Sequence, residues 1–361
     1  MAPTMRFTPT PPFITITFIF FVLTLGIHFH LFSKNDTNHG EPSPPDPVTT
    51  EPPGVGLDLT GFYGTVAVSF PNGTTMSIGR VEGSSHYEEV IRRLSLWSSC
   101  HLHPPYQEIP DKFLDLPRET LRSIRKSIGL PASGDVGALA TMIQKLQVQA
   151  EDALGVPLAT VPFFLSTPPL PALYAEDILD AFEYLSLPFP KGGWRGSWAW
   201  VRDTGAALAG YGRFLCSDYR DYEACKSEID RMPSIQVLSI LYTEKGLKIL
   251  QTGVHSAHAV AGFWDDEERW TLGHALRGEE GYWDRVAVRL MDWKRNWPGS
   301  RTPELILLFG ESSADDTFRS VLQNVFVEEF GSVPEILGGS DEYVVAWGAA
   351  EFARVSFFGV H

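Results

Sequence analysis

Basic residues are scarce in this chain of 361 residues, which has 29 lysines and arginines against 44 aspartates and glutamates and a formal net charge of −15. No Lys/Arg-rich run interrupts this acidic background, so the phosphate backbone of a nucleic acid would be repelled. The sequence therefore predicts no nucleic-acid partner.

The motifs of several common hydrolases and metal sites are also missing. Neither Gly-x-Ser-x-Gly nor His-Glu-x-x-His occurs. Only three cysteines are present, and Cys100, beside His101 and His103, lacks a fourth ligand at zinc spacing. Cys216 and Cys225, nine positions apart, are a disulfide candidate if the body lies in an oxidising compartment, and remain thiols otherwise.

Formal charge is absent from residues 13–32, FITITFIFFVLTLGIHFHLF, which follow a short tail of residues 1–12. Twenty helical residues at 1.5 Å each match a hydrocarbon core of about 30 Å, so this stretch predicts a transmembrane helix, a single-pass signal-anchor. The alternatives are a cleaved signal peptide, although no small-x-small site follows, and a buried core helix. Arg6 and Lys34 flank the segment without an imbalance, and the short tail favours a lumenal or extracellular body.

Residues 33–53 are dense in Pro, Asp, Asn and Thr and contain too little apolar surface to fold, which predicts a disordered linker. Two Asn-x-Thr triplets make Asn35 and Asn72 glycosylation candidates. Asn72 also has a purely structural explanation, because Asn72-Gly73 is a strong signal for a two-residue hairpin turn.

Hydrophobic residues make up 43% of the chain, enough for one large two-lobed domain or two small ones. Strand patterns open at residue 54 and again at residue 234, where a second hairpin turns at Lys245-Gly246, and helical patterns follow each hairpin. A C-terminal helix carries small residues that we expect to pack against the opening sheet: Ala346, Gly348, Ala349 and Ala350. The repeated pattern predicts a two-lobed α/β fold with a cleft.

Six segments, in this order, carry a family resemblance: GLDLTGFYGTVAV, AEDALGVPLATVPFF, RDTGAALAGYG, WTLGHALRGEEGYWDRV, LILLFGESSADDTFRSVLQNVF and DEYVVAWGAAEFA. Together they resemble the actin-like ATPase superfamily, closest to the nucleotide-binding domain of the 70-kDa heat-shock chaperones. The resemblance implies a ribonuclease H-like repeat, with a first lobe at 54–232 completed by 340–361 and a second lobe at 233–339. It also implies ATP with Mg²⁺ as ligand, whereas we expect the chaperones' peptide-binding domain to be absent.

The two phosphate loops of the family are altered. The first is normally Asp-Leu-Gly-Thr-Thr and here runs from Asp58 to Phe62 as DLTGF, so Asp58 keeps the metal-side carboxylate while Thr60, Gly61 and Phe62 replace the glycine and the two hydroxyls. Asp58 is otherwise a turn carboxylate bonded by local N–H groups. The second loop, normally Asp-Leu-Gly-Gly-Gly-Thr, has become TEKG, where Glu244 would repel phosphate, unless this is simply an exposed hairpin turn.

Three further positions bear on nucleotide chemistry. Asp203 occupies the position of the family's catalytic glutamate, but it also suits a helix N-terminus. The adenosine-side turn keeps Gly310 and precedes Ser312, while the second glycine has become Glu311. Residues 95–107, where the family's catalytic lysine is expected, contain no lysine.

These alterations predict a membrane-anchored pseudo-ATPase that acts as a binding or scaffold protein for an unknown protein partner. The alternative is an ATP-binding protein or weak ATPase of the heat-shock chaperone type that uses Asp58 and Asp203. A sugar kinase of the same superfamily is disfavoured, because no Asp-bearing base motif occurs between the lobes.

Overall fold

The computed structural model describes residues 51–188, 200–262, 270–296, 302–339 and 341–356. Within these ranges no helix combines the length and the apolar character needed to cross a bilayer. The transmembrane segment predicted at 13–32 and the sequon at Asn35 lie outside the described residues. The chain from Glu51 onward forms one compact unit.

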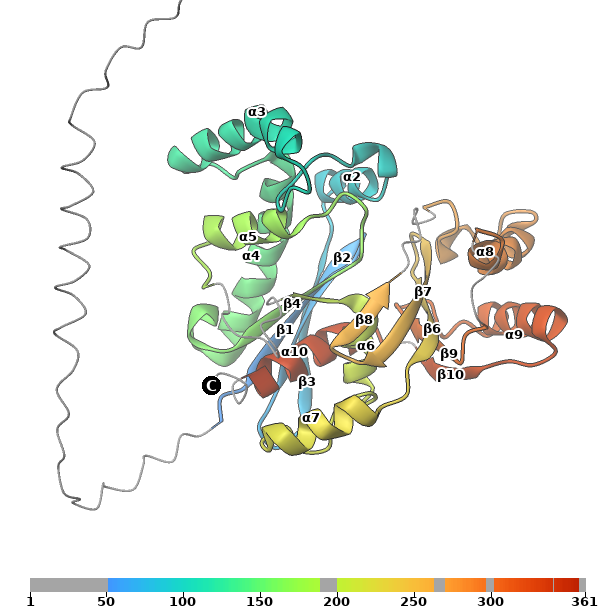
Figure 1. Ribbon diagram of the computed structural model, residues 1–361. Helices are drawn as coiled ribbons and strands as arrows, with labels where there is room; N and C mark the ends of the chain where they lie inside the picture. The colour runs from blue at the N-terminus through green and yellow to red at the C-terminus, as the bar shows by residue number, and fades with distance from the viewer. Residues whose placement is uncertain (1–50, 189–199, 263–269, 297–301, 340, 357–361) are drawn as a thin grey trace, which may run out of the picture. The chain divides into compact units, whose positions relative to one another are not determined.

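A first five-stranded sheet has the order β3-β2-β1-β4-β5 (Figure 1). Its strands are β1 (Gly54–Leu59), β2 (Tyr63–Ser69), β3 (Thr75–Glu82), β4 (Phe163–Thr167) and β5 (Trp200–Arg202). Strands β1 to β3 form an antiparallel meander, and β4 and β5 continue the sheet in parallel. The predicted hairpin turn joins β2 to β3, where Gly73 has φ +81° and Asn72 accepts a hydrogen bond from the Thr74 N–H.

A second five-stranded sheet has the order β10-β9-β6-β7-β8. Its strands are β6 (Ile235–Tyr242), β7 (Leu247–Ser256), β8 (Ala259–Gly262), β9 (Leu305–Phe309) and β10 (Glu335–Gly338). Strands β6 to β8 again form an antiparallel meander, and β9 and β10 run parallel to β6. Strand order and direction therefore repeat those of the first sheet, which agrees with the expected two-sheet α/β fold of the actin-like type.

Helices cover both sheets. Between β3 and β5 lie α2 (Ser85–Leu94), α3 (Ile109–Ser127), α4 (Gly134–Leu154) and α5 (Ala175–Tyr184), and after β5 come α6 (Asp203–Gly210), α7 (Tyr222–Arg231), α8 (Tyr282–Asn296), α9 (Asp316–Phe330) and α10 (Val344–Ser356). Helix α4 begins at a Ser133 cap and ends at Gly155, whose φ of +69° closes the helix as its sequence predicts.

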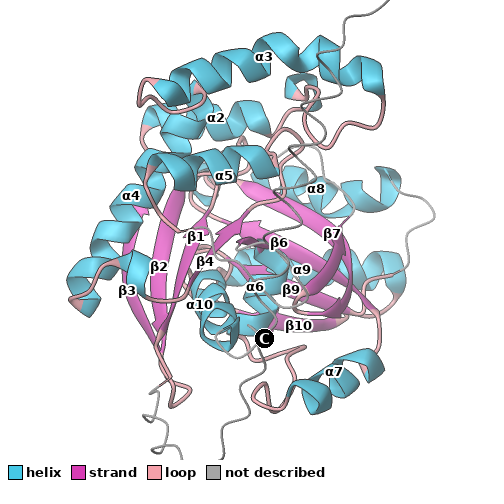
Figure 2. Cartoon of the chain, turned by 60° about the vertical axis from the view of Figure 1, so that its left-hand side comes forward, coloured by secondary structure: helices cyan, strands magenta, loops and turns pink. Residues whose placement is uncertain are grey.

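Helices α6 and α10 lie between the two sheets, as Figure 2 shows. Helix α10 approaches β1 over two glycines, since a Cβ on Gly56 would lie 2.0 Å from the Ala346 carbonyl oxygen and one on Gly54 would lie 2.3 Å from that of Ala350. Gly348 does not face the opening sheet as expected, because its missing Cβ would lie 1.7 Å from the Ala206 carbonyl oxygen of α6. Small residues on two sides of α10 thus serve two different contacts.

The first described residue, Glu51, is bonded to the body although the sequence places it in the linker. Its carboxylate accepts from Arg354 Nη1 at 2.6 Å, from Arg220 Nη2 at 2.7 Å and from the Tyr219 hydroxyl at 3.2 Å. Three residues ahead of β1, the chain is therefore already bonded to α10 and to the loop before α7.

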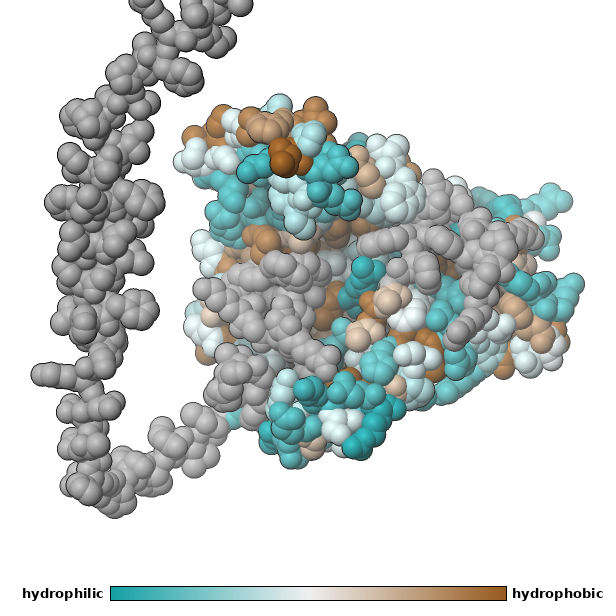
Figure 3. Space-filling view, viewed as in Figure 1, coloured by the Kyte–Doolittle hydropathy of each residue, from teal (hydrophilic) through white to brown (hydrophobic). Residues whose placement is uncertain are grey.

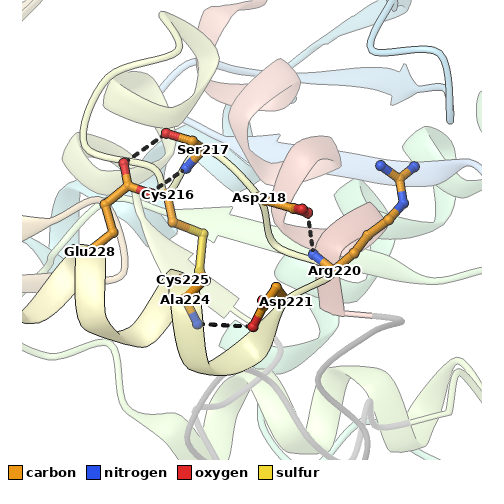
Figure 4. The surroundings of a disulfide bond; sticks show 8 residues. All are labelled: Cys216, Ser217, Asp218, Arg220, Asp221, Ala224, Cys225 and Glu228. Carbon is orange, nitrogen blue, oxygen red and sulfur yellow. Dashed lines mark hydrogen bonds between the residues drawn. A yellow bond between two sulfur atoms is a disulfide. The ribbon is translucent and has the colours of Figure 1, made fainter.

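A disulfide joins Cys216, in the loop after α6, to Cys225 on α7 (Figure 4). The same loop is fixed at the helix start by Asp221, which accepts from the Ala224 N–H at 3.0 Å, and by Glu228, which accepts from the Ser217 N–H at 2.8 Å. These bonds hold a loop that contributes no ligand to the candidate site described next.

Candidate functional site

Asp58 lies near the end of β1, opposite Thr65 of β2 and Ser166 of β4. Its side chain is buried, and neither its Oδ1 nor the Thr65 hydroxyl has a hydrogen-bond partner among the described residues. Burial raises the pKa of Asp58 to about 8; the nearby Asp203 charge adds to the shift, while Ser166 and Lys248 oppose it. The carboxyl is thus mostly protonated at neutral pH.

Asp203 forms a buried ion pair with Lys248 of β7, whose Nζ lies 3.5 Å from Asp203 Oδ2. The other carboxylate oxygen accepts from the Thr204 N–H at 2.7 Å, at the first turn of α6. Asp203 lies in the first turn of α6, but Arg202 is the N-cap and no described side chain caps the helix, so the expected capping role of Asp203 is wrong. Lys248, which the sequence analysis missed, places a fixed ammonium beside the two carboxyl groups.

The turn between β1 and β2, which contains Gly61, is closed by its own threonine. Thr60 Oγ1 accepts from the backbone N–H groups of Phe62 at 3.1 Å and Tyr63 at 3.0 Å, and donates to the Tyr63 carbonyl at 2.8 Å. The Phe62 ring is buried and packs edge-on against Trp270, with 4.4 Å between centroids. The N–H groups of Phe62 and Tyr63, two donors that a phosphate would need, are therefore already bonded to Thr60.

The turn between β6 and β7 repeats this arrangement. Thr243 Oγ1 accepts from the N–H groups of Gly246 at 3.0 Å and Lys245 at 3.3 Å, and donates to the Gly246 carbonyl at 3.1 Å. The remaining turn N–H, that of Glu244, donates to Glu311 Oε1 at 3.1 Å. This hairpin is not a simple exposed turn, because Thr243 is fully buried.

The expected adenosine-side turn follows β9 and contacts the second hairpin. Gly310 has φ +97°, and a Cβ there would lie 2.5 Å from the Tyr242 carbonyl oxygen, so glycine is required at this position. Ser312 donates to Glu244 Oε1 at 3.2 Å, and the same oxygen lies 2.9 Å from His274 Nδ1. The side chains of Ser312, Glu244 and His274 are therefore bonded to one another.

Ion pairs connect the two halves around these turns. Lys245 Nζ lies 2.5 Å from Glu88 Oε1 of α2. Arg80 of β3 pairs with Glu342 and lies 3.6 Å from Glu311. Lys245 thus links the turn between β6 and β7 to α2, and Arg80 links β3 to the turn after β9.

This set of groups does not suit Mg²⁺ with a nucleotide. A cation there would compete with the Lys248 ammonium, which already lies 3.5 Å from Asp203 Oδ2. Over the described ranges no group of three or more His, Cys, Asp or Glu side chains could hold a metal ion. We therefore derive no catalytic step through a metal.

The sequence analysis brought Asp58 and Asp203 to one site but missed the groups that surround them. Thr60 was noted only as a replacement for the family's glycine, and Thr243 only as part of the altered second loop, although Ser and Thr hydroxyls commonly cap turns. Lys248 lies in a predicted strand, and the alternation of apolar and polar residues along a strand does not show which charged side chain is buried. Asn72 lies at the exposed tip of the β2–β3 hairpin, away from this site.

Comparison with known proteins gives no family for this chain. No family model and no curated protein matches the chain. Among solved structures, it is similar to an inorganic polyphosphate/ATP-glucomannokinase from Arthrobacter sp. strain KM, with 13% sequence identity, a TM-score of 0.40, and coverage of 84% of this chain and 98% of that one. A likeness at this level carries no argument about activity.

Proposed function

We propose that the chain is an actin-like-fold pseudo-ATPase, of the heat-shock chaperone branch, that acts as a membrane-anchored binding or scaffold protein with little or no ATP hydrolysis. One observation carries the proposal: in both hairpin turns a threonine hydroxyl already accepts the backbone N–H groups that phosphates would require.

Phosphoryl transfer depends on donors and metal held in place before the substrate arrives. Removing one such donor costs roughly 10²- to 10³-fold in rate. Here Thr60 and Thr243 each occupy two donors, and Lys248 sits where a cation would otherwise pair with Asp203. A nucleotide would have to break all of these bonds to be held as the fold's ATPases hold it.

The alternative, an ATP-binding protein or weak ATPase using Asp58 and Asp203, is favoured by one detail. Asp58 Oδ1 is buried without a hydrogen-bond partner among the described residues, which a bound water or a ligand group would supply.

Calorimetry of the full-length protein with Mg-ATP separates the two. We expect no binding tighter than roughly millimolar and no hydrolysis above background. Micromolar binding that is lost in Asp58→Ala would overturn the pseudo-ATPase proposal and support the alternative. The double variant Thr60→Gly/Thr243→Gly frees the four turn donors, so a gain of ATP affinity there would identify the hydroxyl caps as the cause.

The membrane part of the proposal rests on residues 13–32. Full-length protein should remain in the membrane fraction after carbonate extraction, because about 20 apolar residues insert too favourably to be washed off. A lumenal or extracellular body would be protected from protease in sealed microsomes, and glycosylation would be lost in the double variant Asn35→Gln/Asn72→Gln. Release by carbonate, or digestion of the whole body from the cytosolic side, would contradict the anchor or its orientation.

A further inference from the structure

Helix α3 turns its apolar side outward. Of its 19 residues, only Asp115 and Arg122 are buried. Large apolar side chains along it and just beyond its end are 44 to 78% exposed: Ile109, Phe113, Leu114, Leu116, Leu121, Ile124, Ile128 and Leu130. Figure 3 shows this apolar surface over α3.

The charged side chains of α3 form ion pairs with acidic residues of α5. Arg122 lies 3.0 Å from Asp177 and 2.5 Å from Asp180, and Lys126 Nζ lies 2.8 Å from Asp180. Arg118 lies 2.5 Å from Glu176. Because the polar face is fixed against α5 by these ion pairs, the apolar face cannot rotate inward and needs an occupant from outside.

The exposed apolar face is large. With about 150 to 200 Å² per large side chain, these exposed fractions leave roughly 800 Å² of apolar surface, above the 300 to 600 Å² of the largest patch on a typical monomer. A standard stable interface buries about 800 Å² per partner. Figures 1 and 2 place α3 outermost at one end of the first half, where a second molecule can approach.

Along this exposed apolar face, the spacing of six large side chains is the same whether it is counted from the N-terminal or the C-terminal end of α3. Their positions, 109, 113, 116, 121, 124 and 128, are separated by 4, 3, 5, 3 and 4 residues. We propose that two copies of this chain form a dimer by pairing α3 with α3 antiparallel about a two-fold axis. Ile109 then meets the partner's Ile128, Phe113 meets the partner's Ile124, and Leu116 meets the partner's Leu121, so that these three pairs are apolar.

The helix dipoles favour the antiparallel direction. Antiparallel pairing sets the two dipoles against each other, whereas parallel pairing would bring like ends together. A second copy of the chain therefore suits the apolar face of α3 better than a lipid surface does, because binding to a lipid surface does not require this reciprocal spacing.

Cysteine cross-linking of the full-length protein in its own membranes tests the pairing, in a Cys100→Ser background that removes the exposed free thiol. Thr120→Cys, about 5 Å along the axis from its own copy, should give a covalent dimer with a short bismaleimide. Ile128→Cys alone, about 28 Å from its copy, should give none, but Ile109→Cys co-expressed with Ile128→Cys should cross-link.

Adding Phe113→Glu and Ile124→Glu to the Thr120→Cys protein should lower the cross-linked fraction roughly 10-fold, because charge is placed in the centre of the interface. Val327→Glu on α9, 52% exposed against 54% for Ile124, is the matched control and should change nothing. Equal unfolding temperatures of the three proteins ensure that folding is intact. The absence of a Thr120→Cys dimer, efficient cross-linking by Ile128→Cys alone, or a dimer indifferent to the glutamates would each overturn the proposal.

Discussion

Asp58→Asn should make the stability of the protein less dependent on pH. Burial raises the pKa of Asp58 from 3.8 to about 8 in the folded chain. The folded state therefore holds this proton more tightly than the unfolded state. The resulting stabilisation is fully present below about pH 4 and is lost as the pH rises through 8.

The size of the effect follows from linkage. Between pH 4 and 8 the folded chain binds up to one more proton at this site, so the free energy of unfolding falls by up to about 1.4 kcal/mol per pH unit. From pH 4 to 7 this amounts to at most about 4 kcal/mol. Asparagine resembles the protonated carboxyl and cannot ionise, and its NH₂ can donate to the unpartnered Thr65 hydroxyl.

The assay is denaturant unfolding of wild type and variant at pH 5, 6, 7 and 8. Other titrating groups cancel in the difference between the two proteins, which should grow in favour of Asp58→Asn by about 1 kcal/mol per unit. Thr65→Val is the control, because it removes a neighbouring buried hydroxyl without removing a titrating group and should shift stability equally at every pH. A flat difference for Asp58→Asn would refute the reasoning and mean that Asp58 is ionised in the folded state.

Three other perturbations test the packing of the body. Asp203→Asn should lower the free energy of unfolding by about 3 to 5 kcal/mol, since it strands the buried Lys248 ammonium, and Lys248→Met added to it should recover part of the loss in the same denaturant titration. Gly348→Ala should cost about 1 to 3 kcal/mol in thermal unfolding, because its Cβ would meet a backbone carbonyl at 1.7 Å, whereas Gly137→Ala on α4 should be neutral or stabilising; equal melting temperatures would show that the α6–α10 contact is loose. Cys216→Ser should destabilise by about 2 to 3 kcal/mol if the protein is made in an oxidising compartment, and a melting temperature unchanged by the substitution or by reductant would show that the disulfide does not form in the native protein.

Much of the fold could be predicted because its signals are local. Asn72-Gly73 and Lys245-Gly246 define turns through their own backbone preferences, and the strands beside them are rich in β-branched residues. Helix α3 was missed for the opposite reason. Pro117 interrupts its pattern, and its large apolar residues are mostly exposed, so no core accounts for them.

The candidate site was harder to predict, since its chemistry depends on which groups meet in space. The resemblance placed Asp58 and Asp203 together, but only the fold brings Lys248 from another sheet between them. The threonines at 60 and 243 lie in different halves, and their equivalent turns become evident only when the two sheets are seen to share one strand order.

Strand β1 has a mechanical consequence that follows from its place in the first sheet. It is both the first strand after the N-terminal segment and the central strand, bonded along its length to β2 on one side and β4 on the other. A pull on the chain ahead of Glu51 would first load the ion pairs to Arg354 and Arg220 and then β1 along its own axis. In that shear direction the hydrogen bonds of two ladders resist together instead of opening one at a time, so the body is built to withstand tension from its N-terminal side.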